Sequence, residues 1–357
     1  MVSIKINQLK MGDKLIEDVL TPLGSTLFAK DRVISERDLD ILTAFMVTRV
    51  QIATSMTEEL IKKEEVAEAK AGAKVIAPVS PFIKEYDKMV DMLRNVPHLI
   101  LANQPIPLMD IRQQLEKIFN HISEYNLITF APAYLNNIDY VMHKSVLTSL
   151  TSYLLAQWVG FPQKDWMQIA LAGLLMDIGN ARIDSSILSK PGQLTDSEKD
   201  EMKKHTIIGY QILRNITALN EGVKLAALQH HERVDGSGYP NGFDGKKLHP
   251  YSKIVAVADI YHAMTLNKVY RKPISPYLVM EQIQSDAFGK LDPVYVRIFI
   301  EKVAKFNTGT KVKLSDNRIG EIVFFERDYP TRPWVSINNV IVNLTIERNL
   351  HIIEVLQ

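Results

Sequence analysis

The chain has 357 residues, of which 46% are apolar, so it is long enough to form two or three domains with substantial hydrophobic cores. Its 42 basic and 41 acidic residues leave a formal net charge of +1, which gives no overall electrostatic reason to bind DNA, RNA or an anionic membrane. The absence of cysteine excludes disulfides, thiolate metal sites and cysteine nucleophiles, so a metal would have to be bound by His, Asp or Glu.

Residues 1–54 are predicted to form a small α+β module. Short runs of alternating apolar and polar residues, interrupted by Gly12, Pro22 and Gly24, are typical of strands, and VTRVQIA is expected to be the last of them. A helix is expected to begin at Ser35 and to continue through ERDLDILTAF. The N-terminus has no apolar segment of the signal-peptide kind, and no stretch approaches 18 uninterrupted apolar residues, so we expect a cytoplasmic protein without a membrane span.

Residues 55–125 are predicted to be a helical connector. The sequence EELIKKEEVAEAK combines helix formers with opposite charges three and four residues apart, which is typical of a solvated helix. Two amphipathic stretches follow, near 82–95 and 107–122. They could mediate contacts in a homodimer or cover the next domain, and the sequence does not separate these two alternatives.

From residue 126 to 305 the apolar positions recur three and four residues apart, which predicts an all-helical domain. The segments SVLTSLTSYLLAQWVG, DWMQIALAGLLMDIG, SEKDEMKKHTIIGYQILRNI and SKIVAVADIYHAMT show this period. Residues 306–357 change to short alternating runs around Asn, Gly and Pro, which predicts a small β-rich module. The predicted fold class is therefore mainly α: an all-helical core between a small N-terminal α+β module and a small C-terminal β-rich module.

The run HHERVDGSGYP concentrates groups that bind metals and nucleotides. His230 and His231 are neighbours at the end of a predicted helix, where adjacent side chains point about 100° apart, so we expect them to serve different ions or different halves of one cluster. Gly236 and Gly238 allow the backbone to approach a ligand closely, and Tyr239 offers a ring for stacking or a hydroxyl for a phosphate. A turn without a chemical role is the structural alternative.

Other candidate ligands lie on predicted helices. Asp139 and His143 are four residues apart, so they share one helix face and can approach the same ion. Asp177 follows the apolar segment ALAGLLM and Asp259 lies inside IVAVADIY, where a buried carboxylate needs a partner or a metal. His205 precedes an isoleucine-rich helical segment, so a structural histidine at the edge of the core is the alternative there.

Together these segments resemble the HD-GYP family, whose members are metal-dependent phosphodiesterases acting on the bacterial second messenger cyclic di-GMP. The segments IDYVMHKSV, LLMDIGNARI, KKHTIIGYQIL, HHERVDGSGYP, IVAVADIYHAMT and NKVYRKPIS follow the order and approximate spacing of that family. The resemblance implies two or three divalent cations, iron or manganese, with Asp177 as the catalytic and metal-bridging carboxylate. The metal ligands that it implies are His143, Asp177, His205, His230, His231, Asp259 and Asp139.

The family's phosphate-binding groups also have counterparts in this chain. Lys268, Arg271 and Lys272, in NKVYRKP, are expected to neutralise phosphate charge, although a solvated charge cluster would look the same. With the two glycines and the tyrosine of HHERVDGSGYP they form the expected ligand-binding set. Asn180 stands where the family commonly has lysine, which removes a cation that could help to hold a phosphate.

The histidine of the family's HD pair is replaced by Met176, whose thioether is a soft and weak ligand for iron or manganese. The resemblance implies that this change damages the metal position that also uses His143 and Asp259, and spares the position that uses the later histidines. His262, one turn after Asp259 on a predicted helix, is a hypothetical replacement ligand, with an exposed substitution as the alternative. Asp139 stands where some members have glutamate, which keeps the charge and shortens the reach.

Three functional hypotheses follow from these residues and the resemblance. The first is a metal-dependent phosphodiesterase that hydrolyses cyclic di-GMP to pGpG, to GMP or to both. The second is a catalytically degraded relative that acts as a cyclic-dinucleotide sensor or as a scaffold for signalling proteins, which the changes at positions 176 and 180 favour. The third is a phosphohydrolase for another cyclic dinucleotide, because the motifs specify phosphate and metal better than base. A homodimer or a signalling-protein partner is compatible with each hypothesis.

Overall fold

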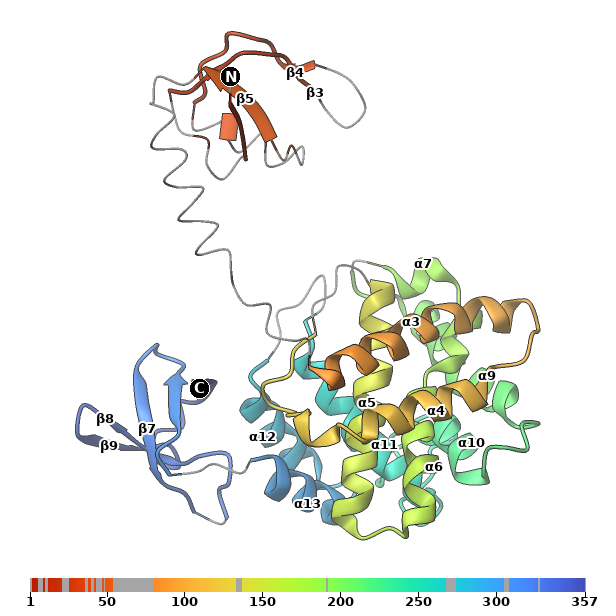
Figure 1. Ribbon diagram of the computed structural model, residues 1–357. Helices are drawn as coiled ribbons and strands as arrows, with labels where there is room; N and C mark the ends of the chain where they lie inside the picture. The colour runs from red at the N-terminus through yellow and green to blue at the C-terminus, as the bar shows by residue number, and fades with distance from the viewer. Residues whose placement is uncertain are drawn as a thin grey trace. The chain divides into compact units, whose positions relative to one another are not determined.

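The chain divides into two units, Met1–Pro78 and Val79–Gln357, in the computed structural model (Figure 1). The residues that the structure describes are 2–5, 9, 12–20, 26–35, 38–39, 42, 47, 49–53, 80–132, 137–190, 192–267, 274–304, 308–326 and 328–356. The predicted connector helix within residues 55–79 therefore lies outside the described residues.

The first unit contains short antiparallel strands with a small core of its own. The strands are β1 Val2–Lys5, β2 Lys14–Leu15, β3 Val19–Leu20, β4 Thr26–Phe28 and β5 Arg49–Ala53. They form one sheet in the order β1-β5-β2 and a second sheet of β3 and β4. The buried side chains are Leu9, Leu15, Val19, Phe28, Ile34, Leu42, Val50 and Ile52. Of the helix predicted after Ser35, Asp38, Leu39 and Leu42 are helical and the other residues lie outside the described part of the chain.

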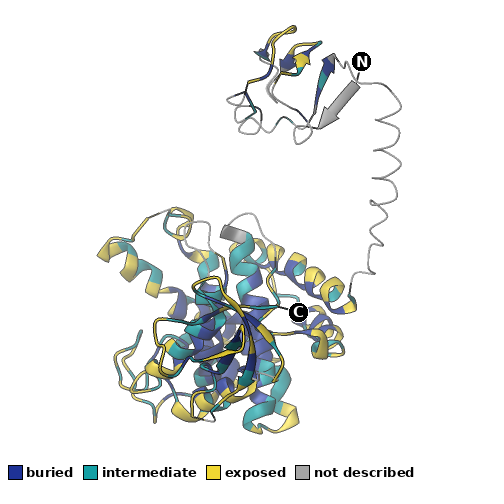
Figure 2. Ribbon diagram, turned by 90° about the vertical axis from the view of Figure 1, so that its left-hand side faces the viewer, coloured by how far each residue is buried: buried dark blue, intermediate teal, exposed yellow. Residues whose placement is uncertain are grey.

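The second unit is built mainly of helices, which confirms the predicted fold class. Its helices are α3 Pro81–Leu101, α4 Leu108–Phe119, η2 Ile122–Glu124, α5 Asn137–Val159, α6 Gln163–Leu175, η3 Ile178–Arg182, α7 Ser185–Leu188, α8 Asp196–Lys203, α9 His205–Leu213, α10 Glu221–Gln229, α11 Pro250–Thr265, α12 Pro276–Asp286 and α13 Pro293–Val303. Helix α5 packs against α3, α6, α11 and α13, and is therefore central to the unit. Buried positions gather on the inner faces of the helices and exposed positions on their outer faces (Figure 2).

The predicted helical segments are confirmed, with one division that the sequence did not indicate. The segment SEKDEMKKHTIIGYQILRNI forms two helices, α8 and α9, with Lys204 between them. Helices α3 and α4, which contain the two amphipathic stretches, pack against each other, and α3 packs against α5. These stretches therefore cover the helical core, whereas the domain boundaries at residues 55, 126 and 306 stay predictions.

Helices α5 and α6 approach closely because small residues line their contact. A Cβ atom on Gly173 would lie 2.9 Å from Oγ of Ser152, and the hydroxyl of Ser149 donates a hydrogen bond of 2.7 Å to the carbonyl oxygen of Ala170. Close packing of this kind fixes the end of α6 against α5. It thereby places Asp177, which follows α6, beside the side chains of α5.

The C-terminal part of the second unit is a five-stranded antiparallel sheet, which confirms the predicted β-rich module. The strands β6 Lys311–Leu314, β7 Ile319–Phe324, β8 Trp334–Ile337, β9 Val340–Asn343 and β10 Ile352–Leu356 lie in the order β10-β6-β7-β8-β9. Asn338 and Asn339 join β8 to β9 with φ values of 50° and 66°, which asparagine tolerates better than most residues in a two-residue hairpin turn. Arg332 binds Glu281 of α12 at 2.7 Å, so the sheet is attached to the helices.

Among the residues that the structure describes, no helix combines the length and the apolar character that crossing a membrane requires.

We predict that Gly179→Ala lowers the free energy of unfolding by about 1–3 kcal/mol, because the added methyl group overpacks a backbone contact. A Cβ atom on Gly179 would lie 1.9 Å from the carbonyl oxygen of His205 and 2.6 Å from the amide nitrogen of Gly209. The matched control is Gly192→Ala, where no atom lies within 4 Å of the added Cβ. Urea unfolding followed by circular dichroism measures both variants, and equal values for the two would contradict the prediction.

Candidate metal centre

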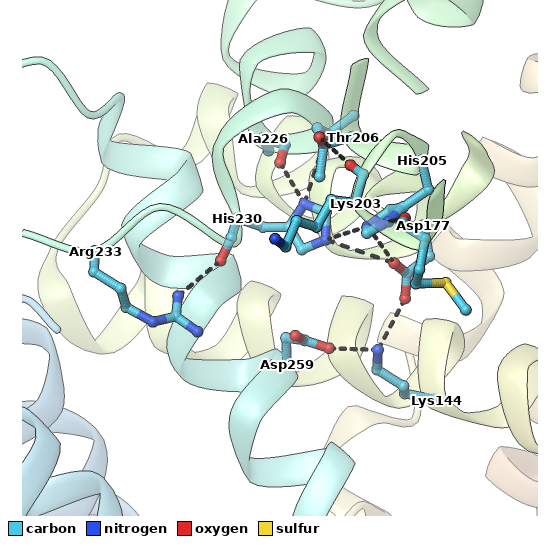
Figure 3. Close-up of polar contacts among 11 residues, drawn as sticks. Lys144, Asp177, Lys203, His205, Thr206, Ala226, His230, Arg233 and Asp259 are labelled. Carbon is cyan, nitrogen blue, oxygen red and sulfur yellow. Dashed lines mark hydrogen bonds and ion pairs between the residues drawn. The ribbon is translucent and has the colours of Figure 1, made fainter. Parts of the chain in front are cut away.

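Asp177, His205, His230 and His231 each direct a ligand atom into one space, and all four atoms lie within 4.8 Å of one another. Nε2 of His205 and Nε2 of His230 each lie 3.5 Å from Oδ1 of Asp177 (Figure 3). The residues come from the end of α6, the start of α9 and the end of α10, so the fold brings together segments that are far apart in the sequence. Within the described part of the chain, no other group of His, Asp and Glu residues meets this distance.

Backbone carbonyl groups orient two of the imidazole rings. Nδ1 of His205 lies 2.6 Å from the carbonyl oxygen of Met202, and Nδ1 of His230 lies 3.0 Å from that of Ala226. A carbonyl oxygen only accepts hydrogen bonds, so each Nδ1 carries a proton and each ring turns its Nε2 toward Asp177. Burial lowers the pKa of His205, so its ring stays in the neutral form that binds metal.

His231 lies in the same group as His230, although the two are adjacent in sequence. Their ring centroids are 4.1 Å apart, because the chain leaves the helix after His230 and the second ring turns back toward the first. The two rings therefore lie in one group of candidate ligands, and whether they bind one ion or two stays a prediction. Burial and the neighbouring imidazoles hold the pKa of His231 well below its usual value.

Lys144 of α5 bridges Asp177 and Asp259. Its Nζ donates a hydrogen bond of 2.8 Å to Oδ2 of Asp177 and lies 2.6 Å from Oδ1 of Asp259. No residue of the described chain satisfies the buried Oδ1 of Asp259 with a hydrogen bond of good geometry, so the second contact is an ion pair. Burial alone would lower the pKa of Lys144, but the two carboxylates raise it well above its usual value. Burial would raise the pKa of Asp177, but Lys144 and the histidines hold it well below its usual value.

His143 and Asp139, two of the predicted ligands, are paired with side chains of α3. Nδ1 of His143 lies 2.7 Å from the hydroxyl oxygen of Tyr86, and Oδ1 of Asp139 lies 2.9 Å from Nη2 of Arg94. Neither residue belongs to the four-residue group of Asp177 and the three histidines, and Asp259 does not belong to it either. The structure thus gathers four of the predicted ligands into one group, and the other three do not belong to it.

The hypothesis that His262 replaces the missing ligand is wrong, and so is the alternative that it is exposed. Only 3% of His262 is exposed, and its Nε2 lies 2.7 Å from Oγ1 of Thr151. Thr151 lies about two helical turns beyond Lys144 on α5, so His262 faces a different part of that helix. Spacing along α11 placed His262 near Asp259, but the packing of α11 against α5 directs its ring elsewhere.

Met176 and Asn180, the two positions at which the chain departs from the HD-GYP pattern, have different surroundings. Met176 is fully buried and belongs to the apolar core. Asn180 lines a cavity of about 870 Å³ that opens beside Asp177, and its buried Oδ1 has no hydrogen-bond partner among the described residues. The cavity walls are mostly apolar, with the guanidinium groups of Arg94 and Arg182 among the polar groups. A volume of this size is in the range of small-molecule sites.

Glu232 holds the loop that follows the paired histidines. Its two carboxylate oxygens accept hydrogen bonds from the backbone nitrogens of Asn241, at 2.7 Å, and Phe243, at 3.1 Å. A Cβ atom on Gly238 would lie 2.4 Å from Cα of Glu232, and Gly236 has a φ of 80°, so both glycines are required by the backbone of the loop itself. Glu232 stands within HHERVDGSGYP as the carboxylate after the two histidines, but its role in holding the loop was not predicted.

Tyr239 stacks on His231, with ring centroids 4.7 Å apart and an angle of 25° between the ring planes. The loop therefore reaches the four-residue group through this tyrosine, and its ligand-binding role stays a prediction. Lys268, Arg271 and Lys272, the predicted phosphate-binding residues, lie outside the described residues.

We predict that the free energy of unfolding decreases as the pH is lowered, because His262 is buried. Burial, with a smaller effect from Lys144, lowers the pKa of His262 from 6.5 to about 3. Between these values the unfolded chain binds a proton that the folded chain does not, so stability is lost as pH falls, by on the order of 1 kcal/mol per pH unit. His262→Gln should flatten this slope in urea unfolding between about pH 6.5 and 4.5. The exposed His98 gives the control His98→Gln, and equal slopes in all three proteins would refute the prediction.

Comparison with known proteins identifies the helical domain. Residues 134–294 match the HD domain family. A cyclic di-GMP phosphodiesterase of Pseudomonas aeruginosa is 31% identical over 185 residues, which cover 52% of this chain and 44% of that protein. A cyclic di-GMP phosphodiesterase of Borreliella burgdorferi is 29% identical over 198 residues, with coverages of 56% and 52%. A 3′3′-cGAMP-specific phosphodiesterase of Vibrio cholerae is 33% identical over 153 residues, with coverages of 43% and 29%.

The matched segment spans about half or less of the length of each of these relatives. It contains all the segments that bring the candidate metal ligands together, from α5 to α11. Residues 134–294 therefore form an HD domain, and the similarity to these cyclic-dinucleotide phosphodiesterases bears out the resemblance of the chain to the HD-GYP family.

Proposed function

We propose that the protein is a metal-dependent phosphodiesterase that hydrolyses cyclic di-GMP to pGpG, to GMP or to both. The observation that carries the proposal is the four-residue group of Asp177, His205, His230 and His231 within an HD domain. Three imidazoles and one carboxylate suit a divalent cation such as iron or manganese. The orientation of two rings by backbone carbonyl oxygens supports the same role, because metal-binding histidines usually have such a partner.

The chemistry divides between the cation and the residues of the chain. A bound divalent cation would activate water and offset the charge that develops on the phosphodiester. Asp177 and the imidazoles would hold the cation, and Lys144 would keep the Asp177 carboxylate ionised and fixed in position. The cavity beside Asp177 would admit the substrate, with Arg182 and the predicted basic residues of NKVYRKP binding its phosphates.

The relatives support a cyclic dinucleotide as the substrate. Those from Pseudomonas aeruginosa and Borreliella burgdorferi are named as cyclic di-GMP phosphodiesterases, whereas one from Vibrio cholerae is named as specific for 3′3′-cGAMP. We therefore place cyclic di-GMP first and 3′3′-cGAMP second. Because such messengers are intracellular, we expect the protein to act in the cytoplasm.

We predict that the protein, purified without oxygen and supplied with Mn(II) or Fe(II), converts cyclic di-GMP to linear products that chromatography separates. His205→Ala removes a cation ligand and should lower kcat/KM by about 100-fold or more, since even the partners of metal ligands are worth 10–100-fold. His121→Ala, at a histidine that belongs neither to the four-residue group nor to the lining of the cavity, should match the parent. A chelator should abolish the activity, and added Mn(II) should restore it.

Two outcomes would change the proposal. Intact cyclic di-GMP with the parent, together with tight binding of the nucleotide in equilibrium dialysis, would refute hydrolysis and identify a sensor. Faster hydrolysis of 3′3′-cGAMP than of cyclic di-GMP would keep the reaction and change the substrate.

A further inference from the structure

We infer that the ammonium group of Lys144 takes the place of a second metal ion, so that this centre binds one divalent cation next to a positive charge supplied by the chain itself. The inference rests on the metal centre proposed above and does not depend on which substrate, if any, is hydrolysed.

The two oxygens of Asp177 face different partners. Oδ1 lies 3.5 Å from Nε2 of both His205 and His230, whereas Oδ2 accepts a hydrogen bond of 2.8 Å from Lys144. A carboxylate that bridges two metal ions offers one oxygen to each of them. Here Asp177 offers one oxygen to the histidine side and the other to an ammonium group, so Lys144 stands on the side where a second ion would bind.

Lys144 also makes the second contact that such an ion would need. Its Nζ lies 2.6 Å from Oδ1 of Asp259, an oxygen that no residue of the described chain satisfies with a hydrogen bond of good geometry. The ammonium group therefore joins one carboxylate from the end of α6 to another from α11 (Figure 3). The exposed fractions of the side chains are 13% for Lys144, 9% for Asp177 and 6% for Asp259, so the three charges lie together away from water.

The position cannot hold Lys144 and a metal ion at the same time. A divalent cation bound to the same two oxygens would lie about 2.0–2.2 Å from each of them, within the volume that the ammonium group occupies. Two buried carboxylates also require a counter-ion, and Lys144 already supplies one. The volume of the ammonium group and its positive charge therefore both exclude a second metal ion from this position while Lys144 stays in place.

The neighbouring residues do not form a second group of ligands. Met176, directly before Asp177, is fully buried and offers only a thioether, which binds iron and manganese weakly. His143, directly before Lys144, has its Nδ1 at 2.7 Å from Tyr86 and does not belong to the four-residue group. The group that does assemble lies on the Oδ1 side of Asp177, so one metal position is kept while the other is filled by the lysine.

The experiment counts metal ions in the intact protein. The parent is loaded with excess Mn(II) and passed through a desalting column, and its manganese is measured per chain by mass spectrometry. We expect one equivalent and the electron paramagnetic resonance spectrum of an isolated Mn(II) ion. Lys253→Ala, which removes a lysine that pairs with Asp292 instead, is the matched control and should also bind one equivalent.

Two further variants separate Lys144 from Met176 as the cause. Met176→His restores an imidazole but leaves the lysine, so it should still bind one equivalent. The double variant Lys144→Ala with Met176→His vacates the position and supplies a ligand, so it should bind two equivalents and give the spectrum of an exchange-coupled pair. Two equivalents in Met176→His alone would show that the missing histidine, and not the lysine, limits the metal count.

Zero or two equivalents in the parent would overturn the inference without reference to any variant, so the test stands even if the double variant does not fold. The outcome is also distinct from that of the hydrolysis assay. A parent with one equivalent and no activity supports the inference and refutes the proposed function, whereas an active parent with two equivalents does the reverse.

Discussion

The helical unit depends on the buried negative charge of Asp177. A carboxylate away from water is costly unless charged or hydrogen-bonding groups surround it, and here the partners come from three directions. Lys144 approaches from α5, His205 from the start of α9 and His230 from the end of α10, while Asp259 of α11 is joined through the lysine. Four helices thus converge on one charge, which makes the candidate centre part of the structural core.

Close backbone contacts give this convergence its geometry. Gly173 lets α6 pack tightly on α5, and Gly179 lets η3 approach the backbone of His205, so the ligands are carried by elements whose separation has little freedom. Carbonyl oxygens of Met202 and Ala226 then select the ring nitrogen that faces Asp177. The same packing that stabilises the unit therefore also directs these imidazole nitrogens toward the position proposed for a cation.

The two carboxylate oxygens of Asp177 face histidines on one side and a lysine on the other. This arrangement connects the proposed chemistry with the positions at which the chain departs from the family pattern. The chain lacks a histidine at position 176 and a lysine at position 180, yet it has a lysine at position 144 that contacts two buried carboxylates. With Lys144 as a fixed cation, an imidazole at position 176 would have no second metal to bind. On this inference, the methionine at position 176 and the lysine at position 144 are linked changes: the lysine fills the position that a second metal would occupy, so no histidine is needed there.

The period of the apolar positions was enough to predict the helical domain and the β-rich C-terminal module. The order of the motifs was enough to predict which segments carry Asp177, His205, His230 and His231. Apolar period reflects which helix face is buried, and these features are therefore local. Sequence did not predict that Lys144 is buried between Asp177 and Asp259, although a lysine next to His143 inside an apolar helix was a signal for it.

Contacts between distant segments decided the rest. Spacing along the helices had suggested His143, Asp139 and His262 as residues near a metal. In the structure, His143 pairs with Tyr86 and Asp139 with Arg94, both on α3. His262 pairs with Thr151. Spacing along a helix determines which residues share a face, but only the packing of one helix on another determines what that face meets. The sequence by itself thus determined the resemblance to the HD-GYP family, the elements and the kinds of candidate ligand, because these depend on residue type and local spacing. The tertiary structure decided which side chains lie together beside Asp177 and that Lys144 pairs with it, because both depend on how distant helices pack.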